Sequence, residues 1–421
     1  MAYQTVTHNS YGSRVKKSAG GVGTGFLMLI AGIVLLFWNE GRTVKMTRTI
    51  KEVDKLAVEM SDISTVNPEF EGKVIHAIGD AKTDDVLTDA YFGISRNAIK
   101  LQASPEYYQY VEITHEEHKD KVGGGEDVIK TYTYEKQWVS SPRNSSSFAD
   151  PNYQNVNNRP ILYPEMTSQS LQAENVSFGA YRLPASLVGQ MSDSKPFEIT
   201  LSDEKVAEIN DGAKKLYNDM SADYVHVANN VIYLGRNSSS PEIGDMRITF
   251  TEVLPAEVSI ISKVVGDTFE SYHSDKNDKD FNVLSEGSHS KSEMIATAKS
   301  NNKMLAWLLR ALGILLLYMG FKSIFGILDT LAKVLPFLSS IVSLGTGLVS
   351  GILAFALGLI IIAIAWIWYR PLLGILLLAA VVAMIWFFTK KGKEKKAQKA
   401  AEEAAAAAAA PAPAAPEAPQ E

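Results

Sequence analysis

Residues 20–42 read GGVGTGFLMLIAGIVLLFWNEGR, and this stretch decides the fold. Its first nineteen residues, 20–38, contain no charged side chain. At about 1.5 Å of rise per residue, a helix of this length nearly crosses a hydrocarbon core of about 30 Å. The aromatic pair Phe37-Trp38 and the charges that follow are typical of a bilayer interface. The stretch therefore predicts a transmembrane helix over residues 20–40.

A cleaved signal peptide is the competing interpretation, because Arg14, Lys16 and Lys17 precede the apolar stretch. The stretch is longer than the usual apolar part of a signal peptide, and no small-x-small cleavage site stands before the charged residues. We therefore expect a retained helix. A short, unstructured polar tail precedes it over residues 1–19, and a charged connector follows over residues 43–55.

The last third of the chain predicts three more spans, over residues 304–324, 342–368 and 371–388, because residues 304–388 are nearly all apolar. Only two residues separate the last two spans, so they should form a tight hairpin. Between the second and third spans, apolar residues recur at helical spacing over residues 325–341. This pattern predicts an amphipathic helix at the membrane surface. A water-exposed loop of a larger bundle is the alternative.

Residues 41–303 have the composition of a water-soluble domain rich in β-strands. The clearest element is a hairpin over residues 108–138, in which aromatic residues alternate with polar ones around the glycine triplet 123–125. Short strands are expected at 74–78, 224–227, 231–234, 246–252 and 258–265, with one helix beginning after Ser202 and a surface loop over 140–170. We predict a multi-pass α-helical membrane protein with four transmembrane helices. A large β-rich α+β domain lies between helices one and two.

Topology follows from the basic residues. Six lysines open the C-terminal tail, residues 389–421, which continues as an Ala/Pro-rich segment. Such a cluster marks the cytoplasmic side, and four crossings bring the N-terminus to the same side. The domain would then lie outside the cytosol, although Arg42, Lys45 and Arg48 speak against this orientation. The Ala/Pro tail resembles a bacterial linker, which favours a bacterial inner membrane and a periplasmic domain.

The sequence gives no sign of catalysis. A net charge of -6 argues against a nucleic-acid partner, and the absence of cysteine excludes disulfides and thiolate metal sites. His115-Glu116-Glu117-His118 could suggest a metal site, but histidines three apart on a strand point to opposite faces. The glycine triplet could cradle a phosphate, but it lacks the lysine and helix start of such loops and is better explained as a turn. We expect a protein that is not an enzyme and has no catalytic residue, cofactor or metal.

Polar and small residues inside the spans are the candidate site. Arg310 lies about 8 Å inside the second span by helical rise, where it either snorkels to the interface or pairs with Glu40 at the end of span one. Arg42 and Arg370 are rival partners for Glu40. Gly347 and Gly351 lie on one face of span three, where helices of one bundle or of two subunits can approach closely. The structural or interface candidates are Trp38, Asn39, Glu40, Arg42, Arg310, Gly347, Gly351 and Arg370.

Several segments together resemble one family. They are Phe-Trp-Asn-Glu-Gly-Arg at 37–42, Glu-Gly-Lys-Val-Ile-His-Ala-Ile-Gly at 71–79, Tyr-Gln-Tyr-Val-Glu at 108–112, the strand at 134–138, Pro-Glu-Ile-Gly-Asp at 241–245 and Tyr-Arg-Pro-Leu at 369–372. In this order they are similar to motifs of the transmembrane protein 43 family, also called LUMA. The resemblance covers about residues 13–390 and not the Ala/Pro tail, so we expect a bacterial member.

The resemblance implies four spans, a large domain outside the cytosol and a role in organising membrane protein complexes, and it brings no catalytic residues. We therefore expect a non-enzymatic membrane scaffold that self-associates. A lipid-binding or channel-like protein is the alternative. The expected partners are membrane lipids, a second copy of the chain and other membrane proteins. If the source is eukaryotic, the expected location changes to the endoplasmic reticulum and inner nuclear membrane.

Overall fold

The computed structural model describes residues 3–121, 124–155, 159–332 and 345–369, with a few single positions between 375 and 386. The chain divides into two compact units. Residues 1–17 and 45–304 form the first, which we call the β-rich domain. Residues 18–44 and 305–421 form the second, which we call the helical bundle.

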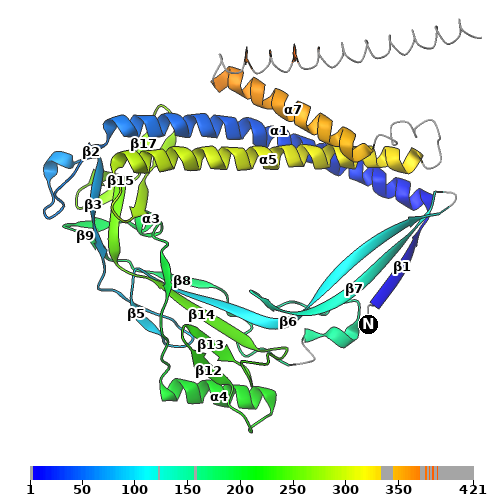
Figure 1. The fold of residues 1–421 in the computed structure, drawn as a ribbon, viewed down its shortest axis with the longest axis horizontal. Coiled ribbons are helices and arrows are strands. Elements are labelled where there is room, and N and C mark those ends of the chain that lie inside the picture. Colours follow the sequence, from blue (N-terminus) through cyan, green and yellow to red (C-terminus); the bar gives the residue numbers. More distant parts are fainter. Residues whose placement is uncertain are drawn as a thin grey trace, which may run out of the picture. The chain divides into compact units, whose positions relative to one another are not determined.

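Three long helices dominate the part of the chain that the structure describes: α1 (Tyr11–Leu56), α5 (Lys291–Ala332) and α7 (Thr346–Tyr369) (Figure 1). Each contains a stretch long and apolar enough to cross a membrane. The first three predicted spans are therefore present as helices. The fourth, residues 371–388, lies almost wholly outside the described residues.

Helices α1 and α5 extend beyond the predicted spans, and α1 already begins at Tyr11. Helix α1 continues to Leu56, so the charged residues 43–55 are helical and not a separate connector. Helix α5 does not end at residue 324 but continues without a break to Ala332. The rest of the predicted surface helix, residues 333–341, lies outside the described residues. Intrahelical hydrogen bonding explains both extensions, because once formed a helix adds residues at little cost until a breaker intervenes.

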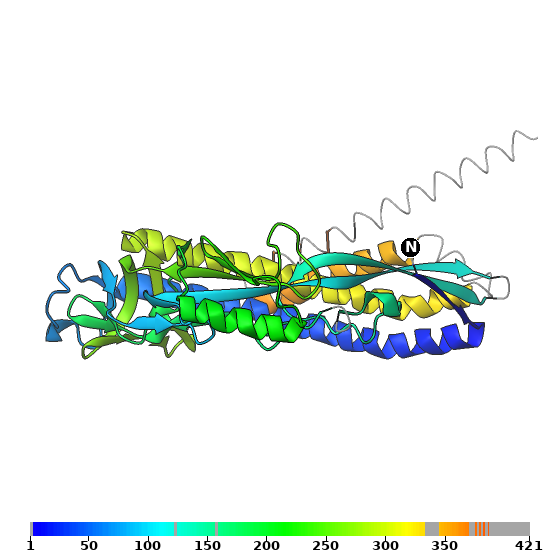
Figure 2. The same ribbon diagram turned by 90° about the horizontal axis from the view of Figure 1, so that it is seen from below.

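One sheet of the domain contains eight strands. Its main path is β1-β7-β6-β14-β13-β12, with β8 added to β6 and β11 added to β14. These strands are β1 (Tyr3–Asn9), β6 (Lys100–Asp120), β7 (Glu126–Val139), β8 (Gln169–Gln172), β11 (Ser194–Pro196), β12 (Val225–Ala228), β13 (Val231–Leu234) and β14 (Met246–Val253). The predicted hairpin is confirmed as β6 and β7, which form the long ribbon in cyan and teal in Figure 2. One face packs on helix α4 (Asp203–Tyr217), which Ser202 caps as predicted.

The second sheet closes on itself. Strand β15 pairs with β3 and also begins the path β15-β16-β10-β9-β3, so these five strands form a ring, with β19 and β2 added outside it. The strands are β2 (Val58–Glu59), β3 (Val74–Lys82), β9 (Val176–Phe178), β10 (Tyr181–Leu183), β15 (Ala256–Val265), β16 (Thr268–Glu270) and β19 (Val283–Glu286). Phe178, Tyr181 and Phe269 fill the core, because alternate residues of a closed sheet point inwards.

Short elements complete the domain. Two small hairpins pair β4 (Val86–Thr88) with β5 (Ser95–Asn97) and β17 (Tyr272–Ser274) with β18 (Lys279–Phe281). Further helical turns in the described part of the domain are η1 (Pro68–Phe70), η2 (Pro151–Tyr153) and α3 (Ala185–Val188). The predicted surface loop after β7 is anchored to the sheet at several points, one of which is Asn155. The side chain of buried Asn155 hydrogen-bonds both the backbone N–H and the backbone C=O of Tyr110, as a neighbouring strand would.

Helices α1 and α5 both continue into the β-rich domain and pack in its core. Ile50 and Val53 of α1 and Met294 and Ile295 of α5 are buried in one cluster with strand residues such as Ile261. Polar contacts support this cluster. The Glu52 carboxylate accepts hydrogen bonds from Tyr272 (2.9 Å), Ser274 (2.7 Å) and Asn277 (3.1 Å). The two helices are therefore built into the domain core.

The N-terminal tail was expected to be unstructured, and this was wrong. Strand β1 pairs antiparallel with β7, from Tyr3 opposite Tyr132 to Asn9 opposite Glu126. The dark-blue strand lies beside β7 in Figure 1. The alternation in YQTVTHN fits an edge strand, but seven residues before a helix give no local sign of their distant partner.

Candidate functional site

Glu40 and Arg310 form a buried ion pair in the helical bundle. Arg310 Nε donates to Glu40 Oε1 (2.6 Å) and Arg310 Nη2 donates to Glu40 Oε2 (2.9 Å). The Glu40 side chain is 1% exposed and that of Arg310 is 13% exposed. This bidentate geometry gives the strongest interaction that arginine makes with a carboxylate. The pairing suggested by the sequence is therefore present, and Arg310 does not merely extend to the interface.

A third helix contributes to the same site. The indole Nε1–H of Trp366 on α7 donates to Glu40 Oε2 (2.5 Å). The Arg310 guanidinium lies over the ring of Trp307 at 4.9 Å and over that of Trp366 at 5.8 Å. Both carboxylate oxygens and the arginine faces are thus engaged. The desolvation penalty of a charge pair buried this deeply is offset only when the remaining hydrogen bonds are also made, as they are here.

The neighbours of Glu40 take different directions. Asn39 is fully buried and donates from Nδ2 to the carbonyl oxygen of Ala306 (2.9 Å), whereas Trp38 is 55% exposed, as expected of an interfacial ring. Gly41 faces Tyr369, whose hydroxyl oxygen would lie 2.6 Å from an added Cβ. Arg42 Nη2 donates to Thr43 Oγ1 (3.2 Å), while its buried Nε has no hydrogen-bond partner among the described residues.

Glycines form the contact between α1 and α5. A Cβ added at Gly25 would lie 2.8 Å from the carbonyl oxygen of Gly320, and one at Gly32 would lie 3.0 Å from that of Gly313. The Ser323 hydroxyl donates to the Gly21 carbonyl (2.7 Å). Apolar side chains gain little from meeting in lipid, so close backbone approach is what holds such helices together. The small residues at 21 and 25 in span one therefore lie at a packing contact.

Replacing Gly25 with leucine should separate α1 from α5. We expect a loss of about 1–3 kcal/mol in the free energy of unfolding, because the added side chain meets backbone that cannot move aside. Gly23→Leu is the matched control, since nothing lies within 4 Å of a Cβ there. Thermal unfolding in a mild detergent measures both variants. Equal stability of the two would show that the glycine contact does not hold the helices.

The glycines of the third span behave differently. A Cβ at Gly351 would meet nothing within 4 Å, and one at Gly347 would come no closer than 3.5 Å to the Tyr318 hydroxyl oxygen. The tight contact on α7 is made instead by Ala354, which is fully buried, and by Gly358 against Ile314. Among the described residues, the structure therefore does not bring Gly347 and Gly351 into a close contact. Arg370 lies outside the described residues.

A second buried charge network lies in the β-rich domain. Asp245 is completely buried and accepts hydrogen bonds from the Tyr233 hydroxyl (2.5 Å), the backbone N–H of Glu242 (2.8 Å) and Arg159. The Arg159 guanidinium lies 3.9 Å from the centre of the Tyr217 ring. Burial raises the pKa of Asp245 and the pKa of Tyr233. This network ties the segment before β14 to β13 and to the end of α4.

Sequence reasoning missed both Trp366 and the Asp245 network. A tryptophan inside an apolar helix needs an acceptor for its indole N–H, and this requirement was the available signal for Trp366. Asp245 stood in the motif Pro-Glu-Ile-Gly-Asp, which carried the family resemblance without a physical role. Its partners Tyr233 and Arg159 are distant in sequence, so no local pattern connects them.

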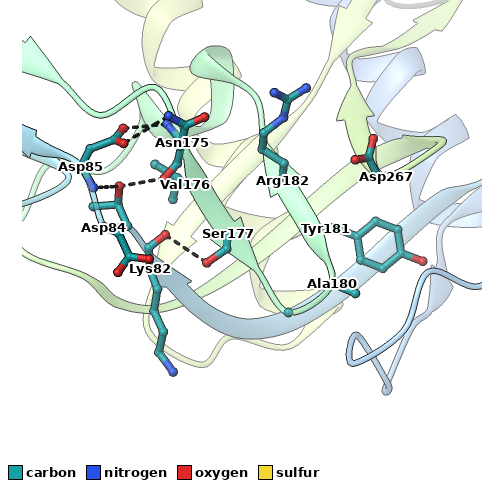
Figure 3. A pocket seen from close by; sticks show the side chains of 12 residues that line it. Lys82, Asp84, Asp85, Asn175, Val176, Ser177, Ala180, Tyr181, Arg182 and Asp267 are labelled. Carbon is teal, nitrogen blue, oxygen red and sulfur yellow. Dashed lines mark hydrogen bonds between the residues drawn. The ribbon is translucent and has the colours of Figure 1, made fainter.

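An open groove of the β-rich domain lies beside β9 and β10 (Figure 3). It has a volume of about 470 Å³ and carries Lys82, Arg182, Asp85 and Asp267 on its walls. The Asp85 carboxylate already accepts the backbone N–H groups of Glu174 and Asn175, which lowers the pKa of Asp85. The groove is open and its charges have both signs. It offers no convergent set of groups for catalysis.

The described residues show no group of histidine and acidic side chains that could hold a metal ion. His118 Nδ1 instead lies 3.1 Å from Glu126 Oε2 across the hairpin.

Comparison with known proteins places the chain in a family. A family model described as "Transmembrane protein 43" matches residues 107–371, which is more than half of the sequence. The chain belongs to the transmembrane protein 43 family. This match confirms the resemblance carried by the sequence motifs. No solved structure matches the chain.

Relatives in this family match along nearly their whole length. "Transmembrane protein 43" of Rattus norvegicus is 29% identical over 376 residues, covering 86% of this chain and 88% of the relative. The human protein of the same name is 27% identical and covers 89% and 90%. A Drosophila melanogaster homolog is 27% identical and covers 86% and 93%. These relatives come from animals, so the comparison gives no support to a bacterial source.

Proposed function

We propose that this member of the transmembrane protein 43 family is a non-enzymatic membrane scaffold that self-associates and organises membrane protein complexes through its β-rich domain. The observation that carries the proposal is that both oxygens of the buried Glu40 carboxylate are hydrogen-bonded within the bundle. Both Glu40 oxygens are occupied by Arg310 and Trp366. Charges that serve transport must face a path or a ligand, whereas these hold three helices together.

The proposed topology keeps both ends of the chain in the cytosol and residues 41–303 outside it. The lysine-rich tail supports this orientation, together with an even number of spans that includes the predicted fourth. In a eukaryotic cell the domain would lie in the lumen of the endoplasmic reticulum or its nuclear extension. In a bacterium it would lie in the periplasm of the inner membrane. Helices α1 and α5 both pack into the domain core, so the first two spans continue directly into the domain.

A lipid-binding or channel-like role is the second candidate, and one observation favours it. Arg42 stands where the apolar stretch of α1 ends, and its buried Nε has no hydrogen-bond partner among the described residues. A lipid phosphate is an anion that a guanidinium at this depth could bind.

Two measurements on the purified protein test the proposal. We expect light scattering in a mild detergent to give a protein mass of two or more 46.0 kDa chains. We also expect vesicles containing the protein to show no more ion flux or lipid transfer than empty vesicles. A monomeric mass would contradict self-association. Flux that disappears on Arg42→Gln would favour the second candidate.

A further inference from the structure

Strand β1 and a membrane-crossing α1 exclude one another. The strand lies directly before α1, and its partner β7 lies after α1 in the chain. The apolar residues 20–38 of α1 stand between them as a continuous helix. If this helix crosses a hydrocarbon core of about 30 Å, residues 3–9 and residues 126–132 lie on opposite sides of the bilayer. The pairing of β1 with β7 cannot then persist within one inserted chain.

Loss of β1 would expose the hydrogen-bonding edge of β7. With β1 in place, Val128 of β7 is 6% exposed. Glu126 is held by Asn9 Nδ2 (3.1 Å) and lies 3.5 Å from Arg14 Nη2. Without the N-terminal segment, the backbone groups of β7 along this edge lose their hydrogen bonds to β1. The Glu126 carboxylate also loses its contacts with Asn9 and Arg14. Natural proteins seldom leave such an edge open, because it pairs readily with another strand.

We propose that in the membrane the β7 edge at residues 126–132 pairs with the same edge of a second copy. This inference deepens the proposed scaffold function and rests on its self-association. All copies inserted with one orientation present this edge on the same side of the bilayer. The resulting contact would be antiparallel and two-fold symmetric, with the same residues contributed by both copies.

The charges along β7 select the register. When the β7 strands of two copies pair antiparallel about a two-fold axis, the residue at the axis lies opposite the same residue of the second copy. With the axis at Val128, Glu126 lies opposite Lys130 of the second copy, and this attraction occurs twice. An axis at Asp127 or at Lys130 would instead place identical charges face to face. Opposite charges across strands stabilise a pair and like charges destabilise it, so Val128 is the expected centre.

The test uses the absence of native cysteine. In native membranes, Val128→Cys should form a disulfide-linked dimer on mild oxidation. Gln137→Cys is the matched control on the same strand and should not, because nine residues at about 3.3 Å each separate it from the axis. Thr5→Cys combined with Lys130→Cys should give no bond within one chain, although these positions are paired in the structure.

Charge exchange gives a second readout. Glu126→Lys should reduce the cross-linked dimer of Val128→Cys about tenfold, because two attractions become repulsions. Adding Lys130→Glu should restore it. If the protein is oligomeric by mass but Val128→Cys does not cross-link, this interface is wrong and the scaffold function stands. If the mass is monomeric, self-association itself fails. A bond between positions 5 and 130 within one inserted chain would overturn the inference and the proposed topology together.

Discussion

Replacing Glu40 with glutamine is expected to lower the free energy of unfolding in detergent by about 3 kcal/mol, because removing one member of a buried ion pair leaves the other charge without a partner. Arg310→Gln should cost a similar amount. The double variant should cost clearly less than the sum of the two, since each single change already breaks the same contact. Thermal unfolding followed by tryptophan fluorescence measures all three, and Trp366 at the site contributes to this signal.

Arg42→Gln is the matched control for this cycle. Arg42 stands two residues after Glu40 but donates to Thr43 and not to the carboxylate. We expect its replacement to have a small effect that adds to that of Glu40→Gln. If the Glu40 and Arg310 changes were strictly additive, the two charges would not meet in solution. If instead Arg42 coupled to Glu40, the rival pairing considered from the sequence would be the real one.

The second large effect is expected at Asp245. Asp245→Asn keeps the shape of the side chain but places an amide where Tyr233, Glu242 N–H and Arg159 all donate. At least one donor would face another donor, and at pH values where Asp245 is ionised Arg159 would lose its buried counter-charge. We expect a loss of about 3–5 kcal/mol, measured by denaturant unfolding of the full-length protein. The control is Glu242→Gln, because Glu242 also contacts Arg159 but is 61% exposed. It should cost under about 1 kcal/mol.

The pH dependence of Asp245→Asn gives a further check. Burial raises the pKa of Asp245, so the folded state holds a proton that the unfolded state has already released. Stability falls as pH rises wherever the folded state binds more protons, here upwards from about pH 4. The variant lacks this titration. The stability advantage of the natural protein over the variant should therefore narrow as pH rises towards the raised pKa. An advantage that stayed constant from pH 4 to neutral would show that Asp245 titrates normally when folded.

The sequence by itself determined the features that depend on neighbouring residues. Span one was predicted from an uncharged run, and a helix of that length follows because the backbone must satisfy its hydrogen bonds internally in lipid. The hairpin β6–β7 followed from alternation around glycines, one of which, Gly124, does take a positive φ of 83°. Even the contact of Glu40 with Arg310 could be predicted, because antiparallel neighbouring spans bring the two charges to the same depth.

The tertiary structure alone decided which faces and distant segments meet. Gly347, Gly351, Ala354 and Gly358 share one face of α7. Among the described residues only the last two make tight contacts, because helices that cross at an angle touch over a limited length. Asp245 finds Tyr233 and Arg159 through the sheet and not through spacing. Strand β1 gains its structure entirely from β7. A short edge strand has almost no stability of its own, so only its partner determines that it forms.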